Sequence, residues 1–83
     1  MSGSLKAKRS VIQSVVRTID RWKSVGVAEV GHLDSWQRSR LGATVVAGSV
    51  SHAEEVADAI ERRIWATPDV TVLSIERDWW EAP

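Results

Sequence analysis

The 83-residue chain carries 11 Lys/Arg and 11 Asp/Glu, with 43% hydrophobic and 27% charged residues, a balance that indicates one small globular domain rather than a disordered chain. It contains no cysteine, which excludes disulfides, cysteine-ligated metal centres and thiol nucleophiles. No apolar run approaches the roughly 20 residues of a membrane span or forms a secretory signal, so we expect a cytoplasmic protein without a membrane partner.

The charges are unevenly distributed along the chain. Residues 1–42 hold eight Lys/Arg and three Asp/Glu, whereas residues 43–83 hold three Lys/Arg and eight Asp/Glu. Such an asymmetry has two possible interpretations. The basic half can form a face that binds a polyanion, or the two halves can neutralise each other within one fold.

The first half of the chain predicts a helix followed by a hairpin. Apolar residues at helical spacing predict an amphipathic helix over residues 4–23, with Ser4 as its N-cap and Gly26 close to its end. Residues 27–33 and 41–47 are rich in valine and predict two strands, joined by a long polar loop.

The second half predicts a helix followed by a strand. Ser51 and Glu54 have the spacing of a capping box, and the apolar periodicity after them predicts a helix over residues 51–66. Residues 70–77 are β-rich and alternate loosely, which predicts a last strand. The whole chain, 1–83, is expected to form one domain, with residues 1–3 as a disordered start and residues 79–83 as a tail.

Several short motifs stand together in the order and spacing of a known family. They are Ser4-Leu5-Lys6-Ala7-Lys8-Arg9, Val27-Ala28-Glu29-Val30 with His32 and Asp34, Trp36-Gln37-Arg38, Leu41-Gly42 and Val45-Val46. With these motifs the chain resembles the YlxP-like family, domain of unknown function 503, over about residues 4–80.

The resemblance implies an α+β fold: a ferredoxin-like two-layer sandwich with two helices on one face of an antiparallel sheet. It also implies a bacterial cytoplasmic protein encoded near translation and ribosome-maturation factors. No catalytic residue of the family is established, so the resemblance carries none over to this chain.

One departure from the family concerns the sheet. Family members begin with a strand before the Ser4 motif, and only three residues precede Ser4 here, so the expected order is α-β-β-α-β. That strand is central in a sheet of order 4-1-3-2, and without it a strand edge is bare and open to pairing with another chain. Three explanations stay open: an incomplete or truncated chain, pairing with a second copy, or movement of the last strand beside residues 41–47.

The same topology offers a structural account of the charge asymmetry. Two antiparallel helices would bring the basic end of the first beside the acidic start of the second, and each set of charges suits its own helix dipole. The residues concerned are Arg17, Arg21 and Lys23 on one side and Glu54, Glu55 and Asp58 on the other.

Two basic segments are candidates for binding RNA or a protein partner. Lys6, Lys8 and Arg9 open the first helix, where free backbone N–H groups can hold phosphate. The hairpin loop offers an aromatic surface for stacking together with cations, the two ingredients of single-strand recognition. Its residues are Trp36, Arg38 and Arg40.

Other chemistries find less support in the residues. His32, Asp34 and His52 have no specific metal-ligand spacing, so neither a metal nor another cofactor is expected. The chain lacks the Asn of an acylphosphatase-like site and the Phe or Tyr of an RNA-recognition motif. Trp22 and Trp65 are expected in or at the edge of the core, and one of Trp79 and Trp80 on a dimer surface.

These observations predict a non-enzymatic accessory protein that associates with itself and with ribosomal RNA or a ribosome-assembly factor. The alternative is a homo-oligomeric structural or small-ligand-binding module that uses its sheet face. A steep salt dependence of binding would favour the first, because phosphate contacts release counterions.

Overall fold

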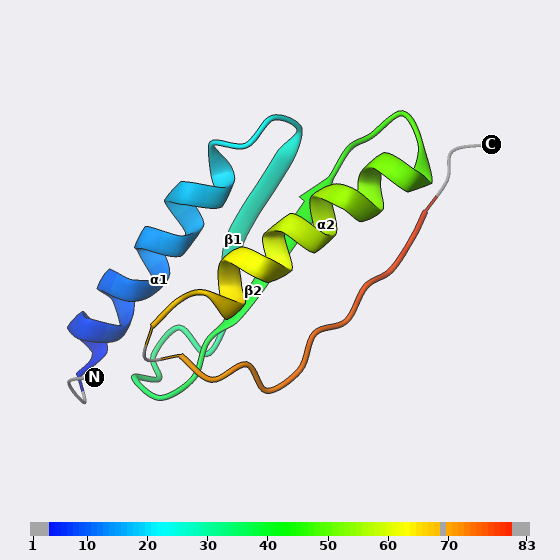
Figure 1. The fold of residues 1–83 in the computed structure, drawn as a ribbon. Helices are drawn as coiled ribbons and strands as arrows, with labels where there is room; N and C mark the ends of the chain where they lie inside the picture. The colour runs from blue at the N-terminus through cyan, green and yellow to red at the C-terminus, as the bar shows by residue number, and fades with distance from the viewer. Residues whose placement is uncertain (1–3, 69, 81–83) are drawn as a thin grey trace.

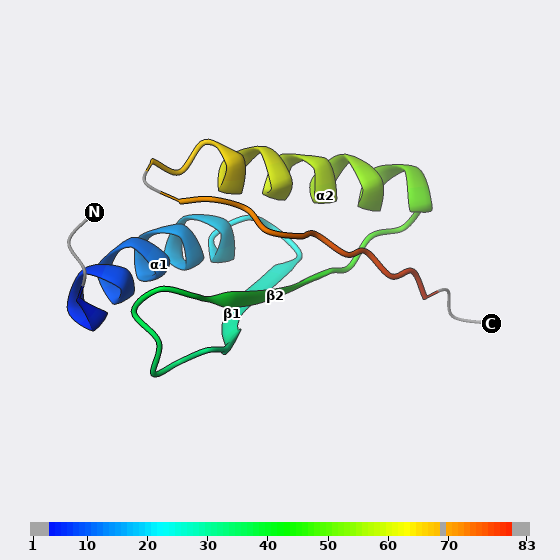
Figure 2. The same ribbon diagram turned by 90° about the horizontal axis from the view of Figure 1, so that it is seen from below.

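The computed structural model of the chain describes residues 4–68 and 70–80. In chain order the elements are helix α1 (Leu5–Asp20), strand β1 (Val25–Gly31), strand β2 (Arg40–Val45) and helix α2 (Val50–Trp65), as Figure 1 shows. The strands form an antiparallel two-stranded sheet, and both helices lie on one face of it (Figure 2). The predicted α+β class, helices and hairpin are confirmed, and a ferredoxin-like sandwich is compatible with this arrangement. The predicted disordered start and the last three residues of the predicted tail lie outside the described residues.

Helix α1 begins where the sequence predicts and ends earlier. The Ser4 side-chain oxygen accepts a hydrogen bond from the Ala7 N–H (3.1 Å), which satisfies one of the free donors of the first turn. The helix ends at Asp20 rather than residue 23, and Ser24, with a φ of 63°, turns the chain into β1. Gly26 is therefore a strand residue and not a helix stop.

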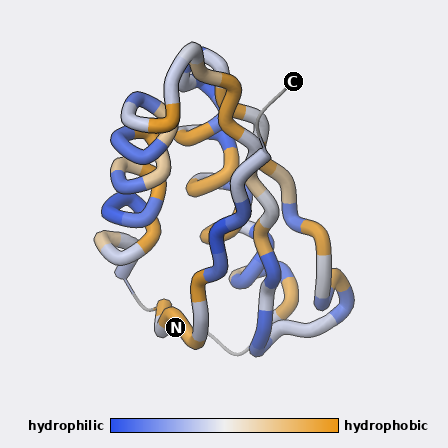
Figure 3. The backbone as a smooth tube through the Cα atoms, turned by 90° about the vertical axis from the view of Figure 1, so that its right-hand side faces the viewer, coloured by the Kyte–Doolittle hydropathy of each residue, from blue (hydrophilic) through white to orange (hydrophobic). Residues whose placement is uncertain are grey.

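The core lies between the helices and the sheet. Val15 and Ile19 of α1 and Ile60 of α2 are buried, and partly buried apolar residues surround them. Figure 3 shows the resulting segregation, with hydrophobic residues turned inward and hydrophilic residues outward on the helices. The prediction for Trp22, which packs against this core, is confirmed, but Trp65 is 60% exposed and its predicted core position is wrong.

Helix α2 begins at Val50, one residue before its predicted start, and its N-cap lies two residues before the predicted one. Ser49, not Ser51, is the N-cap, and its side-chain oxygen accepts from the His52 N–H at 3.1 Å. The third helical position is therefore His52 rather than Glu54, so the predicted capping box does not form. By residue type, either of these two serines could cap the helix, and in the structure Ser49 does so.

The predicted last strand is wrong. Residues 70–80 run extended along the flank of α2 (Figure 1) without pairing to a strand. Arg77 attaches this segment to α2 through Asp58 (2.9 Å) and Glu61 (2.5 Å). A β-rich sequence forms a strand only beside a hydrogen-bonding edge, and here the segment lies along a helix instead.

Candidate nucleic-acid interface

An ion pair between a buried lysine and a partly buried glutamate ties α1 to the sheet. Lys8 Nζ lies 2.6 Å from Glu29 Oε2, and the two side chains are 5% and 16% exposed. Lys8 also donates to the His32 carbonyl oxygen at 2.9 Å, and Ser39 Oγ donates to the Glu29 carboxylate at 2.6 Å. This polar cluster of Lys8, Glu29, His32 and Ser39 joins the first turns of α1 to both ends of the hairpin loop.

Glu29 is ionised in this environment. Burial by itself raises the pKa of its carboxyl, but the hydrogen bonds from Lys8 and Ser39, together with the positive charges of Lys8 and Arg9, outweigh that effect. The net result is a pKa of Glu29 below its ordinary value.

The hairpin loop is ordered by its own hydrogen bonds. His32 has a φ of 60° just beyond the end of β1, and its carbonyl oxygen accepts from the Ser35 N–H. The Ser35 hydroxyl oxygen then accepts from the Gln37 and Arg38 N–H groups at 3.2 and 3.1 Å. These bonds form a compact turn and leave Trp36 at its tip, 44% exposed.

Five of the six predicted interface residues lie at one end of the molecule. The N-terminal turns of α1 and the hairpin loop occupy the same end in both views (Figures 1 and 2). All five residues there are exposed. We call this set the basic end; it consists of Lys6, Arg9, Trp36, Arg38 and Arg40.

The sixth residue, Lys8, has a different role. Its ammonium is buried against Glu29 and is not a surface cation, so the prediction that it faces a partner does not fit its position. The sequence contained a signal for this, because Lys8 lies seven residues before Val15 and eleven before Ile19, on the apolar side of the helix. The polar cluster it forms was missed because Glu29 and Ser39 are distant in sequence.

Within the described residues, the cations of the basic end form no ion pairs. Among residues 4–68 and 70–80, the ion pairs are Lys8–Glu29, His52–Glu55 and those of Arg77. None of them involves the four cations of the basic end. These charges and the indole of Trp36 are therefore available together to a ligand that carries negative charge and a flat ring.

The predicted neutralisation between the two helices does not occur. The helices are antiparallel (Figure 1), yet no ion pair joins Arg17, Arg21 or Lys23 to α2 in the part of the chain that the structure describes. Asp58 pairs with Arg77 instead. Arg17, Arg21 and Lys23 therefore keep a cluster of positive charge around the C-terminal end of α1.

The other predicted candidates do not converge. His32 lies outside β1, so it does not share a strand face with Asp34. Within the described ranges, no group of three or more His, Cys, Asp or Glu side chains is placed to hold a metal ion. None of the helices described is long and apolar enough to cross a membrane.

Comparison with known proteins places the chain in a family. The model of the family described as a protein of unknown function, DUF503, matches residues 1–77. The uncharacterised protein YlxP of Bacillus subtilis (strain 168) is 27% identical over 79 residues, which cover 95% of this chain and 86% of that relative. No solved structure matches significantly. Because the match spans nearly the whole chain and includes every element of the fold, this protein belongs to the DUF503 family and is YlxP-like.

Proposed function

We propose that this protein is a non-enzymatic accessory protein that binds single-stranded RNA through its basic end. The observation that carries the proposal is an exposed tryptophan on an ordered loop, at the same end of the molecule as four cations that form no ion pair within the described residues. The resemblance to a family encoded near ribosome-maturation factors supports ribosomal RNA, or an assembly intermediate that contains it, as the partner.

The physical basis is base stacking combined with phosphate contacts. A base stacked on an aromatic side chain contributes about 1–3 kcal/mol and requires no particular base. Arg38 lies in the loop two residues after Trp36 and Arg40 begins β2, and guanidinium groups suit the phosphates of a strand whose base stacks on the indole. Since hydrogen bonds within the loop already order it, binding would cost little conformational entropy.

Binding of a labelled oligouridylate, followed by fluorescence anisotropy, tests this proposal. We expect Trp36→Leu to weaken binding about tenfold, because it removes a stacking contact. Arg38→Gln with Arg40→Gln should reduce the slope of log K against log salt by about 1.4, since each lost phosphate contact contributes about 0.7 for a single strand.

The matched control is Trp80→Leu, which removes an even more exposed indole (82%) from the C-terminal segment. It should leave RNA affinity unchanged. Equal losses for Trp36→Leu and Trp80→Leu, or no RNA binding by the unmodified protein at low salt, would refute the proposal.

A second candidate function, homo-oligomerisation, rests on the contrast between the two edges of the sheet. The Val46 N–H donates to the Ser24 carbonyl oxygen, so these two residues form a hydrogen-bonded pair. In an antiparallel sheet, such pairs alternate with residue pairs whose backbone groups point away from each other. The backbone groups of Val25 and Val27 therefore point away from β2. Both N–H groups are satisfied, by the Trp22 carbonyl oxygen at 3.3 Å and by the Asp20 carboxylate at 3.4 Å.

The edge of β2 has no such protection. By the same alternation, the backbone groups of Leu41, Ala43 and Val45 point away from β1, and no other strand pairs with them among the described residues. These residues are uncharged and the strand contains no proline, and the charged residue of β2, Arg40, lies at its start, so the edge from Leu41 to Val45 carries neither a charge nor a proline that would block pairing. We propose that two copies pair antiparallel here, with Ala43 opposite Ala43 of the second copy.

Cysteine cross-linking tests this pairing in a chain that has no natural cysteine. Paired Ala43 positions would have Cα atoms about 5.5 Å apart, within the range that a disulfide spans. We expect Ala43→Cys to give a covalent dimer on mild oxidation, with native β structure retained in circular dichroism.

The control is Ala28→Cys, an exposed alanine on β1 away from that edge. It should stay monomeric under the same conditions. Equal cross-linking of the two variants, or a monomer by light scattering at high concentration, would argue against the edge as an interface.

A further inference from the structure

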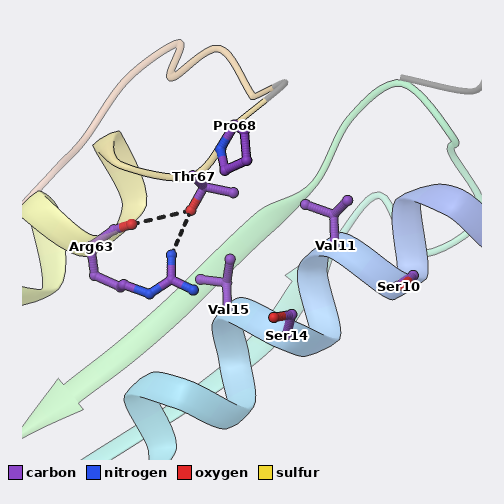
Figure 4. A pocket seen from close by; sticks show the side chains of 7 residues that line it. All are labelled: Ser10, Val11, Ser14, Val15, Arg63, Thr67 and Pro68. Atoms are coloured by element: carbon purple, nitrogen blue, oxygen red, sulfur yellow. Dashed lines mark hydrogen bonds between the residues drawn. The ribbon is translucent and has the colours of Figure 1, made fainter.

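Two shallow hollows on the helical side of the molecule meet at one residue. The first, of about 300 Å³, lies on the outer face of α1 and is lined by Ser14, Arg17, Thr18 and Arg21. The second, of about 280 Å³, lies between α1 and the end of α2 (Figure 4). Ser14 lines both, so the two hollows form one continuous surface that reaches from α1 to α2.

An arginine is held in position on the α2 side of this surface. Arg63 Nη1 donates to Thr67 Oγ1 at 2.9 Å, and the same hydroxyl donates to the Arg63 carbonyl oxygen at 3.1 Å. Thr67 is only 8% exposed, so its anchoring is firm. Figure 4 shows Arg63 extending from the end of α2 toward α1, where Ser14 and Val15 lie. Among the described residues its guanidinium has no other hydrogen-bond acceptor, so the remaining N–H groups can meet a ligand between the helices.

The α1 side contributes further cations and hydroxyls. Arg17 Nε donates to the Gln13 carbonyl oxygen at 3.4 Å, which orients the side chain and leaves its two terminal nitrogens for a ligand. Arg21 adjoins it on the same hollow. The residues that line the two hollows include three arginines, Arg17, Arg21 and Arg63, and no Asp or Glu.

We propose that a phosphate group binds where the two hollows meet, beside Ser14 and between Arg17 and Arg63. Phosphate fits this arrangement because guanidinium groups recognise it with paired hydrogen bonds and serine hydroxyls donate to its remaining oxygens. An oriented arginine binds more tightly than a free one because less rotamer freedom is lost on binding. The site involves other residues than the basic end and does not depend on RNA binding there.

The test is a titration of the full chain with inorganic phosphate at constant ionic strength, followed by two-dimensional amide NMR. Saturable shifts are expected at Ser14, Thr18 and Thr67. Arg17→Gln should weaken phosphate binding about tenfold, the effect of losing one hydrogen bond to a charged group. Arg17 is exposed and its Nε bonds only within its own helix, so this variant is expected to fold. Arg63→Gln should weaken binding to a similar degree, with circular dichroism confirming that the helix end is intact.

The matched control is Arg62→Gln, the exposed neighbour of Arg63 that lines neither hollow. It should bind phosphate as the unmodified protein does. Shifts that never saturate, or equal weakening in Arg62→Gln and Arg17→Gln, would overturn the proposal, because either result means general screening rather than a site.

Two further ligands identify the source of the phosphate. If oligouridylate shifts the same amides and loses affinity in Arg17→Gln, the group is a phosphodiester of a nucleic-acid strand. If uridine 5′-monophosphate does so while the oligonucleotide does not, the site takes a small phosphate ester. Failure of RNA to bind at Trp36 would leave the inorganic phosphate titration unaffected, so the two proposals can fail separately.

Discussion

At the scale of single residues, Lys8 shows how position outweighs residue type. It is a lysine in a basic motif, yet its place on the apolar side of α1 buries it opposite Glu29. A buried charge is tolerated only when it is paired and hydrogen-bonded, and Lys8 has both a carboxylate and a carbonyl partner. The pair orients the loop that carries Trp36 rather than contacting a ligand.

Removing one member of this pair should cost more stability than removing both. Lys8→Met leaves the Glu29 carboxylate buried without its cation, and we expect a loss of about 3 kcal/mol in the free energy of unfolding. Lys8→Met combined with Glu29→Met should recover most of that loss, because the two apolar side chains pack together. Urea denaturation of the three proteins measures the difference, and equal stability of the single and double variants would contradict a buried pair.

The same pair predicts how stability depends on pH. The pKa of Glu29 is lowered in the folded state, so its contribution is complete above the unfolded pKa of about 4.3 and is lost as pH falls through the folded pKa. The double variant should therefore lose less stability on acidification than the unmodified protein. Parallel acid-denaturation curves for the two proteins would show that Glu29 is not the group responsible.

At the scale of elements, the start of α2 shows which of two serines caps the helix, a choice that the sequence alone does not make. Ser49 accepts a hydrogen bond from the His52 N–H, whereas Ser51 lies inside the helix. Ser49→Ala should lower the free energy of unfolding by about 1 kcal/mol, and Ser51→Ala should change it by less than about 0.5 kcal/mol. Thermal denaturation of the two variants gives the comparison, and a reversed order would restore the predicted capping box at Ser51.

The other element boundaries follow the same logic. Helical periodicity located α1 and α2 to within a few residues, because apolar spacing and capping are local properties. The strand prediction for residues 70–77 failed because β structure requires a partner edge, which no local pattern supplies. Arg77 instead joins this segment to acidic side chains on α2.

At the scale of the whole molecule, the apolar surface is large for so small a core. Within the described residues, three apolar side chains are buried, while Val46, Leu73 and Trp80 are each at least 73% exposed. Val46 directly follows the open edge of β2, and Leu73 belongs to the segment without a strand partner. This distribution supports association of the molecule with a second copy. The cross-linking experiment with the Ala43→Cys variant is designed to detect that association.

The sequence by itself determined the secondary elements that rest on local patterns: two amphipathic helices, a valine-rich hairpin and a polar loop that carries Trp36. It also provided the motifs of the family to which the chain belongs. Only the tertiary structure decided that Lys8 is buried, that Trp65 is exposed and that residues 70–77 pair with no strand. The physical reason is that burial, ion pairing and strand pairing depend on neighbours far apart in sequence, whereas periodicity and caps depend on residues within a turn or two.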